Sequence, residues 1–266
     1  MVDNTYEGRD LEALADMPNY YSWIMSWFSP YVRGRVVEYG AGTGTFSQHL
    51  RPLAQRLTLI EPSANLHTAL QAKFIDDPSV EISAMTFEEH VVRLESTAMD
   101  TAVLVNVLEH IEDDRAALSE LSRIVTPDGY ILIFVPALSF LMSHFDVLLG
   151  HYRRYERVEL QNKMESTGIE ILICRYFDFT GVVPWLVLNK LLGSSSFNPV
   201  LVRFYDRAIV PLARGIEAVI TPPIGKNIVA IGRSRRTGSA GKQARSKHNH
   251  DAGEGLFRTH RRSGTW

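Results

Sequence analysis

Three glycines at alternate positions follow a short apolar run early in the chain. The run covers residues 36–39, and Gly40, Gly42 and Gly44 come next, before a sequence typical of a helix start. Glycine has no Cβ, so it can adopt positive φ and let a ligand lie against bare backbone, while free N–H groups at a helix start face that ligand. The pattern predicts a strand, a cofactor-binding turn and a helix.

The spacing of the glycines separates two classes of cofactor. A dinucleotide-binding turn has glycine at the first, third and sixth positions, whereas the sixth position here is Thr45. Glu38, two residues before the first glycine, would repel a pyrophosphate but suits an ammonium or sulfonium group. The turn therefore favours a cationic cofactor, and a tight turn without a ligand stays the alternative.

The stretch from Glu38 to Gly44 resembles motif I of the class I S-adenosylmethionine-dependent methyltransferases. A second stretch, from Asn106 to Ile111, resembles the region that follows the fourth strand in the same family, and the resemblance covers about residues 17–233. It implies an α/β, Rossmann-like fold with a seven-stranded, mostly parallel, doubly wound sheet, an antiparallel last strand and a helical lid or insertion. It also implies S-adenosyl-L-methionine as the cofactor.

The end of the expected second strand carries a further acid. Glu61 and Pro62 follow the apolar residues 56–60, and in a doubly wound sheet this point lies beside the end of the first strand. A carboxylate there can accept hydrogen bonds from both hydroxyls of a ribose. Glu61 therefore favours a ligand that contains a nucleoside, but it does not distinguish one nucleotide cofactor from another. The alternative is that Glu61 is simply an exposed acid at the end of a strand.

The resemblance implies cofactor contacts from three more elements. An aromatic helix within residues 10–32 would close over the cofactor, although its aromatic side chains could equally serve packing alone. The loop after the third strand would border the adenine, at a place where many relatives carry Asp, and Asn106 would lie against the methionine end. The expected cofactor-binding residues are Tyr20, Trp23, Glu38, Gly40, Ala41, Gly42, Gly44, Glu61, Pro62, Met85, Thr86, Asn106 and Val107.

Residues 150–155 read Gly-His-Tyr-Arg-Arg-Tyr and resemble a lid of a bacterial subgroup tied to modification of cell-surface molecules, sugars or lipids. Paired arginines bind phosphate or carboxylate in a bidentate manner, so an anionic acceptor fits. The alternative is that both arginines pair with acids such as Glu156 and Glu159. A histidine can accept a proton or merely hydrogen-bond. The candidate catalytic residues are His110, His151, Arg153, Arg154 and Tyr155.

Composition limits the remaining classes of function. The 266-residue chain is 45% hydrophobic with a net charge of −2, but residues 234–266 hold eight Lys or Arg against two Asp or Glu. We therefore expect a methyltransferase domain over residues 1–233 and a basic, disordered tail over residues 234–266. The acidic domain argues against a nucleic-acid partner. A single cysteine excludes a disulfide framework and a cysteine-rich metal site, and no metal is expected.

An apolar insertion over residues 179–222 could form a pocket wall, lie on a membrane surface or pack on the sheet. Methyl transfer mainly requires the protein to position the methyl donor and the acceptor, so few residues in the sequence indicate which acceptor is used. We expect a cytoplasmic methyltransferase for a small-molecule, sugar or lipid-linked acceptor, with peripheral membrane contact as a further option and the oligomeric state open. The alternatives are a non-catalytic adenosylmethionine-binding or membrane-associated interaction protein, or an NAD-dependent oxidoreductase.

Overall fold

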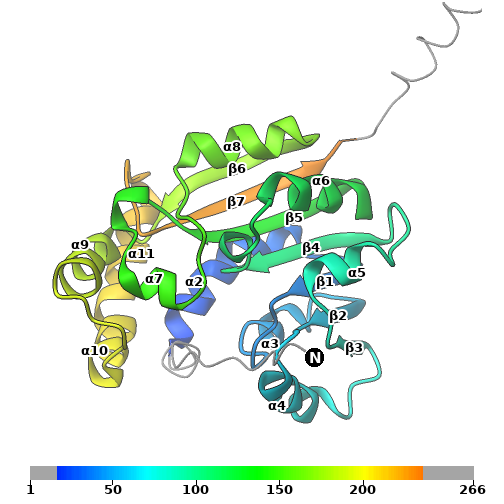
Figure 1. The fold of residues 1–266 in the computed structure, drawn as a ribbon, viewed down its shortest axis with the longest axis horizontal. Helices are drawn as coiled ribbons and strands as arrows, with labels where there is room; N and C mark the ends of the chain where they lie inside the picture. Colours follow the sequence, from blue (N-terminus) through cyan, green and yellow to red (C-terminus); the bar gives the residue numbers. More distant parts are fainter. Residues whose placement is uncertain (1–16, 236–266) are drawn as a thin grey trace, which may run out of the picture. The chain divides into compact units, whose positions relative to one another are not determined.

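A seven-stranded sheet in the order β3-β2-β1-β4-β5-β7-β6 forms the centre of the computed structural model, which describes residues 17–235 (Figure 1). The pairs β1–β2, β1–β4, β2–β3 and β4–β5 are parallel, whereas β7 runs antiparallel to β5 and β6. The predicted doubly wound sheet with an antiparallel last strand is confirmed. The strands are β1 Arg35–Tyr39, β2 Arg56–Ile60, β3 Val80–Ser83, β4 Met99–Val105, β5 Val125–Pro136, β6 Ile169–Phe177 and β7 Asn227–Ser234.

Helices cover both faces of the sheet because its strands are apolar on both faces. Alternate residues of β1 enter two different cores: Val37 and Tyr39 pack with α5, α6 and α8, while Val36 packs with α2, α3, α4 and α11. The helices are α2 Pro18–Phe28, α3 Ser47–Leu50, α4 Ala64–Phe74, α5 Phe87–Val91, α6 Asp114–Ile124, α7 His144–Leu148, α8 Arg157–Ser166, α9 Val182–Pro184, α10 Pro199–Phe204 and α11 Val210–Val219.

The sequence also predicts two helix boundaries, a cap at Ser63 and a helix end at residues 127–129. Ser63 is the N-cap residue of α4, but its side chain makes no capping bond, and its backbone N–H donates to Glu61 Oε1 at 2.9 Å. The second boundary is wrong, because α6 ends at Ile124 and residues 127–129 belong to β5. Asp128 takes a φ of 65° there, and the pairing with β4 shifts register at the same place, so the chain stays in the sheet. The sequence predicts that Asp113 or Asp114 caps the helix now seen as α6, and the cap is Asp113, which accepts from Ala116 N at 2.9 Å.

The expected insertion is helical and lies beyond the carboxyl ends of the parallel strands (Figure 1). Its first helix combines α9 with the π-helical η5, Trp185–Leu191, and its second joins α10, the π-helical η6, Tyr205–Ile209, and α11. Within residues 17–235, the structure has no helix that combines the length and the apolar character needed to cross a bilayer. Residues 10–16 of the expected aromatic helix, and the tail from residue 236 onward, lie outside the described residues.

Candidate active site

A cavity of about 450 Å³ opens at the carboxyl ends of β1, β2 and β4. Since β2 lies on one side of β1 and β4 on the other, this is the point where the strand order reverses, which is where open α/β sheets bind ligands. The glycine turn, the ends of β2 and β4 and helix α2 form one side of the cavity wall. The segment around residues 149–154 and the insertion contribute the other side.

The glycine turn adopts the backbone that its sequence predicts. Gly40, Gly42 and Gly44 have φ values of 65°, 56° and 75°, in the region that side chains with a Cβ rarely enter. A Cβ on Gly40 would lie 2.5 Å from Val107 Cγ2. Gly44 does not line the cavity; a Cβ there would lie 2.7 Å from Leu70 Cδ1, so this glycine allows α4 to approach the turn.

Two buried carboxyl groups flank the turn. Glu61 Oε2 accepts from Gly42 N at 2.8 Å, and each carboxylate oxygen has two lone pairs, so the group can accept further hydrogen bonds from a ligand in the cavity. Glu38 accepts from the Ser47 hydroxyl. Burial raises the pKa of Glu38 to about 8, with a smaller contribution from Glu61 and an opposing one from the Ser47 hydrogen bond. A cationic group in the cavity would favour its ionised form.

Most of the other expected cofactor-binding residues also line the cavity. Asn106 stands at a φ of 53° after β4, held there because its N–H donates to Phe134 O at 2.8 Å. The Tyr20 hydroxyl donates to Asn227 Oδ1 at 3.0 Å, which fixes its ring in the wall. The expected residues that line the cavity are Tyr20, Glu38, Gly40, Ala41, Gly42, Glu61, Pro62, Thr86, Asn106 and Val107.

Two expected contacts, besides Gly44, do not line the cavity. Trp23 is 2% exposed, and its ring centroid lies 3.9 Å from that of Phe177, so it serves packing, as the alternative held. Met85 packs against the core beneath α5 and α6, because β3 ends at Ser83 and the chain turns inward before Thr86 begins the cap of α5.

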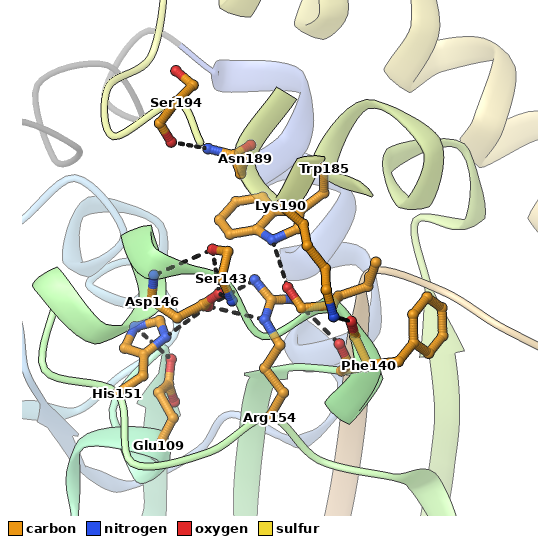
Figure 2. A network of polar contacts seen from close by, with 12 residues as sticks. Glu109, Phe140, Ser143, Asp146, His151, Arg154, Trp185, Asn189, Lys190 and Ser194 are labelled. Atoms are coloured by element: carbon orange, nitrogen blue, oxygen red, sulfur yellow. Dashed lines mark hydrogen bonds and ion pairs between the residues drawn. The ribbon is translucent and has the colours of Figure 1, made fainter. Parts of the chain in front are cut away.

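The segment after β5 supplies the opposite side of the cavity through one buried acid, Asp146 (Figure 2). Its Oδ1 lies 3.1 Å from His151 Nδ1 and 2.8 Å from the Arg154 guanidinium, and its Oδ2 accepts from the Ser143 hydroxyl at 2.7 Å. Burial would raise the pKa of Asp146, but these hydrogen bonds and Arg154 lower it to about 2. Because Asp146 is ionised and can only accept, Nδ1 of His151 donates to it, and Nε2 is the ring nitrogen that faces away from this carboxylate.

The two arginines of the hexad have different surroundings. Arg154 lines the cavity but is buried: it pairs with Asp146, donates to Ala137 O at 3.2 Å and lies 4.4 Å from the centre of the Trp185 ring. Arg153 is outside the cavity, where it pairs with Asp114 at 2.8 Å. The acids that these arginines contact are therefore Asp146 and Asp114, not the expected Glu156 and Glu159.

Tyr155 is also outside the cavity. Its side chain is fully buried, and its hydroxyl donates to Asp114 Oδ2 at 3.0 Å. The backbone of Tyr155 pairs with that of Ala137, which holds the hexad against the end of β5. Of the candidate catalytic residues, the structure brings His110, His151 and Arg154 to the cavity and leaves Arg153 and Tyr155 behind it.

Two histidines that line the cavity lie beside a buried glutamate. The ring centroids of His110 and His151 are 4.6 Å apart, and Glu109 Oε1 lies 4.0 Å from His151 Nε2. Among residues 17–235, neither carboxyl oxygen of the fully buried Glu109 has a hydrogen-bond partner, and burial raises its pKa to about 7. Within the described residues these three could hold a metal ion, with ligand atoms within 4.8 Å of one another. Ligand atoms on one ion are about 3 Å apart, so binding would require them to approach.

Sequence reasoning missed several residues of the cavity. Trp185 and Phe197 come from the insertion, and Lys226 precedes β7. Lys226 Nζ lies 3.3 Å from Asp178 and 5.1 Å from the centre of the Tyr20 ring. These contacts join segments about 40 to 200 residues apart, which a local motif cannot indicate. Asp146 lies four residues before the hexad, and this proximity is the signal in the sequence that could have found it.

The chain matches the family described as "Methyltransferase domain" over residues 13–172, and it belongs to that family. The C-methyltransferase NovU of Streptomyces niveus is 28% identical over 152 residues, which are 55% of this chain and 35% of NovU. A probable S-adenosylmethionine-dependent methyltransferase of Mycolicibacterium smegmatis is 25% identical over 51% of this chain and 52% of its own length. The chain thus spans about half or less of these relatives.

Solved structures of other proteins share this fold. An S-adenosylmethionine-dependent methyltransferase from Mesorhizobium loti superposes with a TM-score of 0.58 at 14% identity, covering 82% of this chain and 99% of that one. At this identity the likeness concerns the fold alone. The insertion and the last strand, from residue 173 onward, lie outside the residues that match the family.

Proposed function

We propose that this chain transfers a methyl group from S-adenosylmethionine to a small-molecule, sugar or lipid-linked acceptor. The observation that carries the proposal is Glu61, a buried carboxylate at the edge of the cavity that is fixed by the backbone of Gly42 and retains accepting capacity. A carboxylate in this position suits the two hydroxyls of a ribose. Membership of the methyltransferase domain family supports the same reading.

The residues of the cavity fit a cationic nucleoside. Gly40 and Gly42 leave bare backbone at the wall, Glu38 supplies a buried carboxyl that a positive charge would ionise, and apolar side chains such as Ile60 and Phe134 exclude water. Asn106 adds an exposed amide at the end of β4. When bound, the cofactor supplies an electrophilic methyl group on a sulfonium, and the chain has to orient the acceptor beside it.

The acceptor would occupy the side of the cavity bounded by His151, Trp185 and Phe197. Asp146 holds the His151 ring with Nδ1 as donor, so Nε2 can take a proton from a hydroxyl or amine as it is methylated. His110 shares this end of the cavity, and partial burial together with the nearby His151 lowers its pKa to about 4, which favours a neutral ring that can accept a hydrogen bond. Arg154 holds Asp146 and Trp185 in place.

The test is calorimetric binding of S-adenosylmethionine and of NAD to the wild type and to Gly42→Val. We expect adenosylmethionine to bind and NAD not to bind, and we expect the Gly42→Val variant to lose binding, because a branched side chain at positive φ would displace the turn. The matched control is Gly193→Ala, which places a Cβ at a φ of 66° where, apart from the two chain neighbours, no atom of the described residues lies within 4 Å. Preference for NAD, or no adenosylmethionine binding, would overturn the proposal.

Binding without turnover would instead support the non-catalytic alternative. A screen of sugars, lipid-linked sugars and small hydroxylated molecules with labelled methyl donor separates the two. His151→Gln is the informative variant, since it keeps a polar side chain but no proton-accepting nitrogen. An enzyme should lose turnover in this variant while adenosylmethionine affinity stays near the wild-type value.

A further inference from the structure

The second helix of the insertion, residues 199–219, buries its acidic side chains and exposes a row of apolar ones, which is the opposite of an ordinary surface helix. Its two acids face the protein: Asp206 accepts from Tyr20 N at 2.9 Å, and Glu217 accepts from Phe179 N at 2.9 Å. Both acids are buried, together with Val210 and Ala213 on the same face. The opposite, exposed face is a stripe of apolar side chains spaced three or four residues apart: Leu201, Phe204, Ala208, Leu212, Ile216 and Val219.

Exposed apolar side chains are concentrated on the insertion. Twelve of the twenty-two exposed large hydrophobic side chains in the described residues lie within residues 179–222. Leu191 and Leu192, at the end of the first helix, are 68% and 72% exposed, and Val200 is 65% exposed. Proteins seldom leave an apolar helix face of this length without a partner.

The charges on the insertion indicate which partner fits. Arg203, Arg207 and Arg214 are exposed on the same helix, each one or two positions from a member of the apolar stripe. The acids of residues 182–224 are Asp206 and Glu217, and both are buried, so the exposed charges of the insertion are positive. Apolar side chains with flanking arginines are the pattern of a helix that lies in the interface of an anionic bilayer.

We propose that the insertion docks on an anionic membrane surface, with the helix of residues 199–219 lying in the plane of the interface. At 1.5 Å per residue this helix would contact about 30 Å of membrane. Trp185 and Phe197 of the same insertion line the cavity, so docking would bring the acceptor side of the cavity to the bilayer. In this respect the inference rests on the proposed function and narrows the acceptor to a lipid-linked molecule whose headgroup is methylated.

The test is co-sedimentation of the full chain with vesicles of phosphatidylcholine, with or without phosphatidylglycerol. The variant is the triple Leu201→Gln, Phe204→Gln and Leu212→Gln, whose side chains are 53%, 61% and 60% exposed. The matched control is the triple Ile75→Gln, Val92→Gln and Val158→Gln, at 79%, 76% and 58% exposure elsewhere on the protein. All six side chains are exposed, so neither triple variant should disturb the core.

We expect the wild type to bind the anionic vesicles, the insertion variant to bind at least about tenfold more weakly and the control to stay within about twofold of the wild type. Three results would overturn the proposal. One is no binding by the wild type, and another is equal binding by the insertion variant, which would assign binding to another part such as residues 236–266. The third is a wild-type dimer that the insertion variant disperses, which would mean that a second copy covers the stripe.

The same variants keep this inference separate from the proposed function. Adenosylmethionine affinity in solution should be equal in the wild type and in both triple variants, because none of the six residues lines the cavity. Loss of adenosylmethionine binding in every protein would defeat the proposed function while leaving the vesicle result unaffected. Normal adenosylmethionine binding without vesicle binding would defeat only the membrane inference.

Discussion

The two sides of the cavity are built in different ways. The side formed by the glycine turn and Glu61 comes from consecutive strands, and its groups are fixed mainly by backbone contacts close in sequence. The side formed by His151, Arg154 and Trp185 depends on buried side-chain contacts, with Asp146 joining the hexad to a helix and Arg154 reaching the insertion. The first side is therefore fixed by contacts at the motif itself, whereas the second depends on contacts that only the folded chain creates.

The largest effect is expected from Asp146→Asn, which tests whether the acceptor side depends on one charge. Arg154 and Asp146 are 1% and 0% exposed, so the change leaves a buried guanidinium without its ion-pair partner. Such a loss costs about 3–5 kcal/mol of unfolding free energy. Urea unfolding would measure it, and adenosylmethionine affinity in the remaining folded protein should stay within about threefold.

The control for this variant is Glu120→Gln, which breaks the pair with Arg123 on the surface of α6. Those side chains are 38% and 33% exposed, so the loss should stay below about 1 kcal/mol. If Asp146→Asn were no more destabilising than Glu120→Gln, the buried network would not hold the acceptor side together. If it abolished adenosylmethionine binding in folded protein, the two sides of the cavity would not be independent.

The same contrast explains which parts of the structure the sequence could predict. The sheet, the glycine turn and the position of Glu61 follow from hydrophobic periodicity and from a motif whose residues are neighbours in the chain. The side chain of Ser63 makes no capping bond because Leu66 N donates to the backbone carbonyl of Ser63 instead, a choice that the sequence does not reveal. The roles of Arg153 and Arg154 could not be separated, because Asp114 and Asp146 approach them only in the folded protein.

A smaller effect for each pH unit is expected from the pH dependence of stability on the cofactor side. The pKa of Glu38 is raised from 4.5 to about 8 in the folded protein. The contribution of this carboxyl group to the free energy of unfolding is therefore complete below 4.5, its pKa in the unfolded chain, and is lost as the pH rises toward 8. Relative to Glu38→Gln, the wild type should lose up to about 1.4 kcal/mol per pH unit across this range. Thermal unfolding of both proteins at several pH values would measure the difference.

Comparing the wild type with Glu38→Gln isolates this carboxyl group. Burial also raises the pKa of Glu217, to about 7, so this group also lowers the free energy of unfolding as the pH rises over the same range. It does so equally in the wild type and in Glu38→Gln, so its effect cancels in the comparison. Parallel pH profiles would show that Glu38 is already ionised in the free protein. In that case the release of a proton on adenosylmethionine binding, which a buried neutral Glu38 implies, should also be missing.

The smallest effect is expected from Arg153→Gln, which tests the boundary of the acceptor side. Arg153 lies outside the cavity on Asp114, and Lys163 also contacts Asp114, at 2.7 Å, so the acid keeps a cationic partner after the change. Once an acceptor is known, kcat/KM should change by less than about threefold. A tenfold fall in kcat/KM with unchanged unfolding temperature would instead mean that Arg153 leaves Asp114 and reaches the acceptor, so that the hexad rearranges when the cavity is filled.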